Sequence, residues 1–193
     1  MFLSYFYRMQ ITGIILAGGK STRMGTDKAL LKIGDKTLLE TAVNLCRPVC
    51  SQILISSDSP AHEIAGLTRI ADDFAGCGPI SGICSCLKQA ENEWCFVISV
   101  DAAFVTSGFV TWLFTQIENT DAIVPIHENG KEPLIALYRK TTLPFFDNQL
   151  VSGNYKMHFL LERFKTKFVD VSDWKSKLPR LFHNINSPED LIL

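Results

Sequence analysis

Runs of apolar residues, separated by polar and glycine-containing segments, recur along the chain and predict its strands. Continuous apolar runs of this length are typical of strands buried on both faces. Segments with apolar residues at helical spacing alternate with them, and this alternation predicts an α/β fold with a sheet covered on both faces. The predicted strands span 10–16, 53–57, 68–71, 94–100, 121–126, 134–138 and 167–171, and the predicted helices span 37–49, 79–90, 107–118, 142–150 and 155–164.

The second half of the chain is less regular than the first. We expect an added antiparallel piece there, and Pro125 places its strand near an edge or an end. A serine N-cap followed by proline and two acidic residues at 187–190 predicts a final helix. Residues 1–8 lack the basic segment and the cleavage site of a signal peptide. We expect them to be a mobile leader to one domain that spans 9–193.

Composition and charge exclude several functional classes. The 193 residues are 47% apolar, and 19 basic side chains against 20 acidic ones give a net charge of -1. This balance excludes an electrostatic nucleic-acid binder and a disordered chain. No apolar run approaches the roughly 20 residues that cross a bilayer, so we expect a cytoplasmic protein without a membrane partner.

The six cysteines and four histidines show no spacing typical of a metal site. No two cysteines form a CxxC pair, and no histidine cluster accompanies them. We therefore expect six free thiols in a reducing compartment. The histidines are scattered, and we interpret them as surface or incidental residues; they are His62, His127, His158 and His183.

The segment after the first predicted strand carries the strongest chemical signal. Ligands bind at the carboxyl ends of strands in open α/β sheets, and Gly18 and Gly19 let the backbone approach phosphate oxygens closely. Backbone N–H groups of such a loop form an anion-binding nest, and Lys20, Arg23 and Lys28 add three cations. The loop therefore favours a triphosphate, against the alternative of a solvated glycine-rich loop. It is not a P-loop, because the first glycine of that motif would stand one residue out of register.

Carboxylates follow two other predicted strands. Asp101 follows the strand at 94–100, and we expect it to face the same crevice as the glycine loop. Mg²⁺ is often held by one or two carboxylates together with phosphate oxygens and water, so Asp101 is a candidate ligand. Its alternative role is a helix N-cap or a turn. Asp72 and Asp73 follow the short strand at 68–71, and either contact a base or ribose or cap a turn.

Two further segments have glycine-rich or polar patterns. Residues 76–82, with Gly78 and Gly82, nearly match G-x-G-x-x-G and precede a predicted helix. They either let a nucleobase lie against the backbone or form a tight turn with close helix packing. Asn184 and Asn186 alternate on a short extended segment and are able to hydrogen-bond a polar ligand.

Together these motifs resemble the molybdenum cofactor guanylyltransferases, the MobA-type nucleotidyltransferase family. The resemblance covers nearly the whole chain and rests on L-A-G-G-x-S-x-R-M-G-x-D-K at 16–28, Gly-Pro-Ile-Ser-Gly at 78–82, Asp101, and the segments at 133–138 and 184–191. It implies a single Rossmann-like domain with a mostly parallel central sheet. It also implies transfer of GMP from Mg-GTP to the phosphate of molybdopterin, with release of pyrophosphate. Other proteins of cofactor biosynthesis are a further class of partner that it leaves open.

The resemblance also implies roles for individual residues. It implies that Arg23, Lys28 and Asp101 act in catalysis, with Asp101 as the Mg²⁺ ligand. The implied nucleotide-binding residues are Leu16, Ala17, Gly18, Gly19, Lys28, Ser56, Asp72 and Asp101, and the implied pterin-binding residues are Gly25, Gly78, Gly82, Lys156, Asn184 and Asn186.

The chain departs from the family pattern at three places. Ala103 stands where the family has proline after the metal aspartate, Ser56 stands where asparagine is frequent, and residues 154–156 lack paired arginines. These departures keep two alternatives open. One is a relative that uses CTP or another phosphorylated acceptor, and the other is a nucleotide-binding module without turnover.

Overall fold

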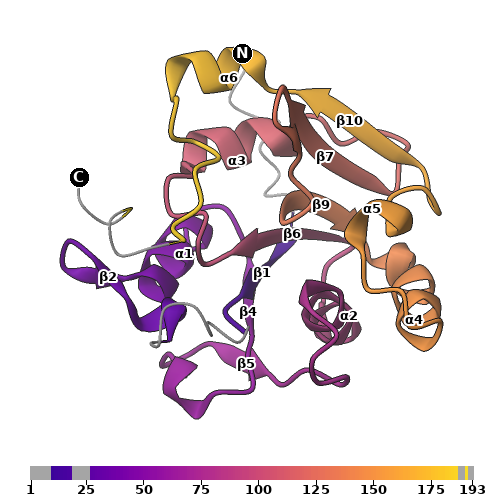
Figure 1. Cartoon of the computed structure of the whole chain (residues 1–193), viewed down its shortest axis with the longest axis horizontal. Coiled ribbons are helices and arrows are strands. Elements are labelled where there is room, and N and C mark those ends of the chain that lie inside the picture. Colours follow the sequence, from indigo (N-terminus) through magenta and orange to yellow (C-terminus); the bar gives the residue numbers. More distant parts are fainter. Residues whose placement is uncertain (1–9, 19–26, 187–189, 191–193) are drawn as a thin grey trace.

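A computed structural model of the chain describes residues 10–18, 27–186 and 190, and shows a central sheet with helices on both faces (Figure 1). The leader expected at 1–8 and residues 187–189 of the expected final helix lie outside this range. The strands are β1 (Ile11–Leu16), β2 (Lys32–Ile33), β3 (Lys36–Thr37), β4 (Gln52–Ser56), β5 (Thr68–Ile70), β6 (Trp94–Ser99), β7 (Ala122–His127), β8 (Gly130–Lys131), β9 (Ile135–Arg139) and β10 (Thr166–Asp170). The helices are α1 (Leu38–Cys46), α2 (Pro79–Gln89), α3 (Ser107–Phe114), α4 (Leu143–Val151), α5 (Met157–Leu160) and α6 (Ser172–Lys177), with 3-10 turns η1 (Lys28–Leu30), η2 (Pro60–His62) and η3 (Lys140–Thr142).

The main sheet has the strand order β10-β7-β9-β6-β1-β4-β5, with β8 paired to β7. Strand β1 pairs in parallel with β4 and β6, whereas β9 is antiparallel to both β6 and β7. Every strand on this path except β9 therefore runs in the same direction. This confirms the mostly parallel sheet and the antiparallel piece expected in the second half. It also places the carboxyl ends of β1, β4, β5, β6, β7 and β10 along one edge of the sheet.

The side chains of β1 pack into two apolar cores, one on each face of the sheet. Ile11 and Ile15 pack into the core shared with α1 and α3, while Ile14 and Leu16 pack into the core shared with α2 and α4. Figure 1 shows these helix pairs on the two sides of the sheet. All six residues of β1 are buried, as its continuous apolar pattern predicts, so the strand gives the residues after it a rigid support.

One helix prediction needs correction, and one helix was not predicted. The helix expected at 155–164 is the short α5, because the chain turns after Leu160, and the hydroxyl of Thr166 donates to the carbonyl of Leu161 at 2.8 Å. Helix α6 follows the last strand, where the apolar pattern indicates no helix. The hairpin of β2 and β3 was also not predicted, and its turn contains Gly34 with a φ of 62°.

Pro125 lies near an edge of the sheet, as expected, although β7 is not itself the edge strand. Its strand β7 lies between β10 and β9. The β7–β9 pairing, however, covers only Ala122 and Ile123, so the proline comes after that ladder has ended. The missing N–H therefore removes no bond to β9. In the part of the chain that the structure describes, no helix is long and apolar enough to cross a membrane.

Candidate active site

Three segments of the chain meet at the carboxyl ends of β1 and β6. The N–H of Val100 donates to the carbonyl of Leu16 at 3.1 Å and ties the two strand ends together. Beside them, Nζ of Lys28 lies 3.1 Å from Oδ2 of Asp101 and 3.3 Å from Oδ1 of Asn186. The structure therefore brings together a lysine, a carboxylate and an amide from distant parts of the sequence.

Lys28 is held by a short turn that is anchored in the protein interior. It is the first residue of η1, and the N-cap Asp27 accepts the N–H of Ala29 at 3.1 Å. Ala29 is buried, so the turn is fixed while the side chain of Lys28 reaches Asp101. The side chains of Lys28 and Asp101 are 21% and 20% exposed. Such a partly exposed ion pair remains accessible to a charged ligand and is weakly stabilising by itself.

The segment at 184–186 alternates between the core and the surface. Ile185 is fully buried, and its N–H donates to the carbonyl of Asp101 at 3.0 Å. Asn184 and Asn186 on either side are exposed, and Nδ2 of Asn186 donates to the carbonyl of Asn184 at 3.3 Å. One buried residue thus anchors the segment beside Asp101 and presents two amide side chains at the surface.

Strand β4 is tied to the beginning of the glycine loop. The carbonyl of Ser56 accepts the N–H groups of Ala17 at 3.0 Å and of Gly18 at 3.1 Å. These two N–H groups are therefore bonded to β4 and do not contribute to the anion nest expected from the sequence. The expected site residues Gly19, Arg23 and Gly25 lie outside the residues that the structure describes.

The described residues around Gly18 would leave room for a side chain at this position. It is not one of the glycines with positive φ, and a Cβ built on it would lie 3.7 Å from the carbonyl oxygen of Ser56. That distance is an ordinary van der Waals contact. The absence of a side chain therefore leaves room beside the backbone, as close approach of a ligand requires.

A second polar pair lies at the ends of β4 and β5. The hydroxyl of Ser56 donates to Oδ1 of Asp72 at 3.0 Å, and the N–H of Asp72 donates to Oδ1 of Asp58 at 2.9 Å. Burial raises the pKa of the Asp72 carboxyl above its usual value, against the lowering effect of the Ser56 hydrogen bond. The nearby carboxylates of Asp58 and Asp73 add to the rise. This pair is a hydrogen-bonding site with little compensation for its negative charge.

Glycines at the start of α2 allow the helix to approach this pair. Gly78, the N-cap of α2, has a φ of 71°, which favours glycine. A Cβ on Gly82 would lie only 2.2 Å from Oγ of Ser56 and 3.2 Å from Oδ1 of Asp72. Close helix packing, one of the two alternatives open in the sequence, therefore accounts for Gly82. Asp73 binds the helix instead, since its Oδ2 accepts from Nζ of Lys88 at 2.9 Å.

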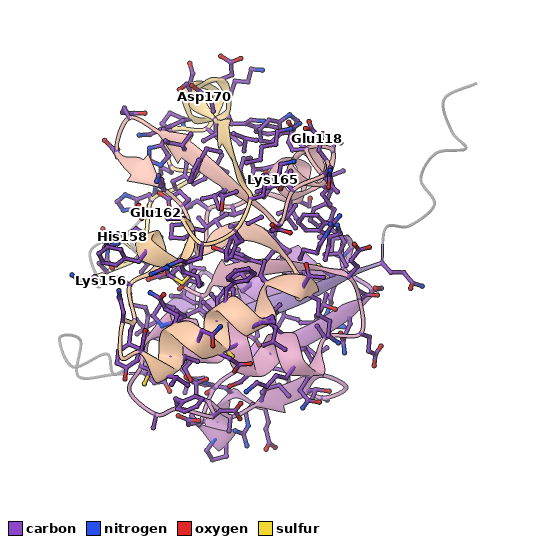
Figure 2. The ribbon with its side chains drawn as sticks, turned by 90° about the vertical axis from the view of Figure 1, so that its right-hand side faces the viewer. Glu118, Lys156, His158, Glu162, Lys165 and Asp170 are labelled. Carbon is purple, nitrogen blue, oxygen red and sulfur yellow. The ribbon has the colours of Figure 1, made fainter. Side chains whose placement is uncertain are left out.

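Lys156 is exposed and forms the N-cap of α5, where Figure 2 labels it close to His158. The side chain of Cys77 raises the pKa of the neighbouring Tyr155 hydroxyl, so the loop before α5 lies beside the loop that leads into α2. Among the described residues, no hydrogen bond or ion pair joins Lys156 to the residues around Asp101.

The side chains of two of the four histidines, His62 and His127, are each only 3% exposed, contrary to the expectation that all are surface or incidental. Nε2 of His62 lies 2.8 Å from Oδ2 of Asp27, and Nδ1 lies 2.6 Å from Oγ of Ser57. His127 makes a similar contact to Glu132 at 2.9 Å. Sequence spacing does not indicate the His62 contacts, because the fold brings Asp27 and His62 together across 35 positions.

Fold and site together are typical of an α/β protein with a ligand site at the carboxyl edge of its sheet. The sheet is mostly parallel, and the Lys28–Asp101 and Ser56–Asp72 pairs lie where its strands end. Ligands of open α/β sheets bind at that edge. A partly exposed lysine–carboxylate pair there is suited to charged phosphate groups.

Comparison with known proteins identifies the family. The model of the MobA-like NTP transferase domain matches residues 13–168. A molybdenum cofactor guanylyltransferase from Vibrio campbellii is 32% identical, over 94% of this chain and 93% of the relative. The crystal structure of molybdopterin-guanine dinucleotide biosynthesis protein A from Archaeoglobus fulgidus is 26% identical, with a TM-score of 0.80 over 93% of this chain and 94% of that one. The chain belongs to the MobA-like NTP transferase family and is a nucleotidyltransferase.

Proteins of lower sequence identity share this fold. The crystal structure of 2-C-methyl-D-erythritol 4-phosphate cytidylyltransferase from Thermus thermophilus has a TM-score of 0.69 at 15% identity, over 93% of this chain and 94% of that one. At this identity the likeness shows a shared fold. The choice of nucleotide and acceptor therefore has to come from individual side chains at the strand ends.

Proposed function

We propose that the protein transfers GMP from GTP to the phosphate of molybdopterin and releases pyrophosphate, forming a guanine dinucleotide cofactor. The Lys28–Asp101 pair supports the proposal, because its cation and its carboxylate lie at the sheet edge where ligands of open α/β sheets bind. The names of the relatives from Vibrio campbellii and Archaeoglobus fulgidus support the guanine nucleotide and the pterin acceptor. We place the proposed reaction in the cytoplasm and propose no membrane partner for it.

The proposed reaction requires the protein to position the reactants and to compensate their charge, and it requires little proton transfer. An oxygen of the acceptor phosphate forms a bond to the α-phosphorus of GTP, and the bond from that phosphorus to the oxygen bridging to the β-phosphate breaks. Pyrophosphate leaves with the electron pair. The attacking group is already an anion, so no general base is needed. The main barrier is repulsion between anions, which the ammonium of Lys28 reduces where charge develops.

Asp101 is suited to hold Mg²⁺ together with the nucleotide. Among the described residues no group of three His, Cys, Asp or Glu side chains forms a ready-made metal site. Mg²⁺ needs no such cage, since it commonly takes one or two carboxylates with phosphate oxygens and water. The partly exposed carboxylate of Asp101 fits that donor set. When bound, the ion would neutralise charge on the transferring and leaving phosphates.

The second polar pair supports a base-binding role. Guanine presents N–H donors on its Watson–Crick edge, and the carboxylate of Asp72 is an acceptor already oriented by Ser56. Arg23 would assist Lys28 at the phosphates, and the main chain of Leu16, Ala17, Gly18 and Gly19 would line the nucleotide. The pterin would contact the remaining polar and glycine positions, which are Gly25, Gly78, Lys156, Asn184 and Asn186, whereas the buried Gly82, expected there from the resemblance, packs against Ser56 and Asp72.

Pyrophosphate release tests the proposal. Protein with Mg²⁺ and molybdopterin is supplied with GTP, CTP, ATP or UTP, and Asp101→Asn is assayed beside the wild type. We expect release with GTP alone, reduced by about 100-fold or more in Asp101→Asn, as for loss of one transition-state charge contact. The matched control is Asp170→Asn, which changes a carboxylate at the end of β10 on the same edge of the sheet but without the lysine (Figure 2).

Each other outcome redirects the proposal. Release with CTP would assign the protein to cytidylyl transfer and would implicate Ser56, which replaces the frequent asparagine. Release that needs a different phosphorylated acceptor would exclude molybdopterin. Binding of GTP without release in the presence of molybdopterin would favour a nucleotide-binding module. Equal loss in Asp101→Asn and Asp170→Asn would remove Asp101 from the catalytic site.

A further inference from the structure

A continuous chain of hydrogen bonds connects strand β4 to the turn that carries Lys28. Oγ of Ser57 accepts the N–H of Ser59 at 3.0 Å and contacts Nδ1 of His62 at 2.6 Å. Nε2 of the same ring contacts Oδ2 of Asp27 at 2.8 Å, and the residue after Asp27 is Lys28. We propose that His62 is a positioning residue, which holds Asp27 and so sets the place of the Lys28 ammonium at the phosphates. This inference rests on the proposed nucleotidyl transfer.

The pattern of donors and acceptors assigns a direction to this chain. The carboxylate of Asp27 can only accept, so Nε2 of His62 donates to its Oδ2. In the tautomer with the ring proton on Nε2, Nδ1 accepts the hydroxyl proton of Ser57, whose oxygen in turn accepts the N–H of Ser59. The other oxygen of Asp27 accepts the N–H of Ala29. Both carboxylate oxygens are therefore used, one to cap η1 and the other to tie the cap to His62.

Burial makes the histidine a rigid element. The side chain of His62 is 3% exposed and that of Asp27 is 38% exposed, so the ring is fixed in the interior while the carboxylate lies near the surface. The η1 turn has only three residues, and its own hydrogen bonds fix little of its orientation. The bond from His62 adds a long-range restraint at the cap. Because Lys28 follows directly, this restraint acts on the backbone from which its side chain extends.

The same three residue types form hydrolytic triads, but this arrangement is unsuited to that chemistry. In the triad, Nε2 faces the serine and Nδ1 faces the aspartate. Here the ring is reversed, with Nδ1 towards Ser57 and Nε2 towards Asp27. Ser57 is also buried, with 1% of its surface exposed, so a substrate cannot reach its hydroxyl. The geometry therefore points to a structural role and not to a second active site. We call the Ser57–His62–Asp27 chain of contacts the relay.

Two substitutions of His62 distinguish its contact with Ser57 from its contact with Asp27. His62→Asn keeps a polar atom at the same number of bonds from Cβ as Nδ1, so it can still contact Ser57 but cannot reach Asp27. His62→Gln places its amide nitrogen as far along the side chain as Nε2 and can still donate to Asp27. A loss that appears in His62→Asn and is largely restored in His62→Gln assigns the effect to the Asp27 bond.

His127 provides a matched control. It is also buried, its Nε2 contacts Glu132 at 2.9 Å, and its Nδ1 accepts the N–H of Asn129 at 3.1 Å. His127→Asn therefore removes a comparable buried histidine–carboxylate contact without touching Asp27 or Lys28. Any loss of activity that follows only from lower stability will appear in both asparagine variants.

The measurements are steady-state pyrophosphate release and calorimetric binding of GTP and of pyrophosphate alone. We expect kcat/KM to fall about tenfold in His62→Asn, mostly in kcat, and to stay within about threefold in His62→Gln and twofold in His127→Asn. Equal loss in both His62 variants, unchanged kinetics in His62→Asn, or equal loss in His127→Asn would overturn the inference. An inactive wild type would refute the proposed function, whereas weaker pyrophosphate binding confined to His62→Asn would still support positioning.

If the His62 variants do not fold, Asp27→Asn tests the same bond from its more exposed end. Its side-chain oxygen can still cap Ala29, while the charged acceptor for His62 is lost. The relay predicts that this variant folds and shows the same fall in kcat. Wild-type kinetics in Asp27→Asn would overturn it.

Discussion

The carboxyl edge of the sheet contains two polar pairs that differ in charge and surroundings. At the ends of β1 and β6, Lys28 and Asp101 form an ion pair that is about one-fifth exposed. At the ends of β4 and β5, Ser56 and Asp72 form a hydrogen bond under the start of α2, with only one ionisable group. The first pair can compensate charge on a ligand, and the second can select hydrogen-bonding groups. In the proposed reaction, the first pair would serve the phosphates and the second the base.

Removing the cation from the first pair should have the largest effect on activity. Lys28→Ala should reduce kcat/KM by about 100- to 1,000-fold, because it removes a preorganised charge where the transition state gains negative charge. The free energy of unfolding should change by less than about 1 kcal/mol, since partly exposed ion pairs contribute little. Pyrophosphate release and urea unfolding measure the two quantities.

Lys167→Ala is the matched control for this lysine. Lys167 also pairs with a carboxylate, that of Glu118, and is similarly exposed at the far edge of the sheet. Its substitution should leave kcat/KM within about twofold. If both lysine variants lose activity equally, the contrast between the two pairs would lose its main support.

Filling the space at Gly82 should disrupt the second pair. A Cβ there would lie 2.2 Å from Oγ of Ser56, so either the serine or helix α2 must move. Gly82→Ala should lower the free energy of unfolding by about 1–3 kcal/mol, as overpacking does, and should raise KM for GTP. Thermal denaturation and steady-state kinetics test both effects.

The cause can be isolated with a second substitution. Ser56→Ala removes the clashing oxygen, so the double variant Ser56→Ala with Gly82→Ala should recover part of the lost stability. The recovery should be incomplete, because the same Cβ also lies 3.2 Å from Oδ1 of Asp72. Additive losses in the double variant would show that Gly82 and Ser56 are not coupled.

The fold was largely predictable because its signals are local. The apolar runs of β1, β4 and β6 predict that these strands are buried, and Gly78 and Pro79 mark the start of α2. The antiparallel β9 lies in the region where an added antiparallel piece was expected. The sequence indicated that Pro125 lies near an edge, but not that it follows the end of the β7–β9 ladder, which depends on the neighbouring strand.

The site was only partly predictable, because its contacts join distant segments. The motifs indicate Lys28 and Asp101 separately, and the parallel sheet explains why they meet. Nothing local indicates that His62 is buried or that it contacts Asp27. The reason for Gly82 is equally non-local, since it becomes evident only once Ser56 and Asp72 face α2.

The smallest expected effect concerns the charge of Asp72. Burial raises the pKa of this carboxyl above its usual value, so between the unfolded and the folded pKa the folded protein holds a proton that the unfolded chain has released. The unfolding free energy of the wild type therefore falls as pH rises from the unfolded to the folded pKa, and stays lower above it. Asp72→Asn removes this penalty while keeping an acceptor for Ser56. The difference in Tm between the variant and the wild type should be positive at neutral pH and shrink on acidification.

Asp170 supplies the control with the opposite sign. Hydrogen bonds from the side chain and backbone of Ser172 lower the pKa of its carboxyl, so its stabilising contribution exists above the unfolded pKa and is lost as pH falls through the folded one. Asp170→Asn should therefore lower Tm at neutral pH and leave activity unchanged, whereas Asp72→Asn should raise Tm but increase KM for GTP about tenfold. A stabilised Asp72→Asn with wild-type KM would leave Asp72 a buried carboxyl without a role in base recognition.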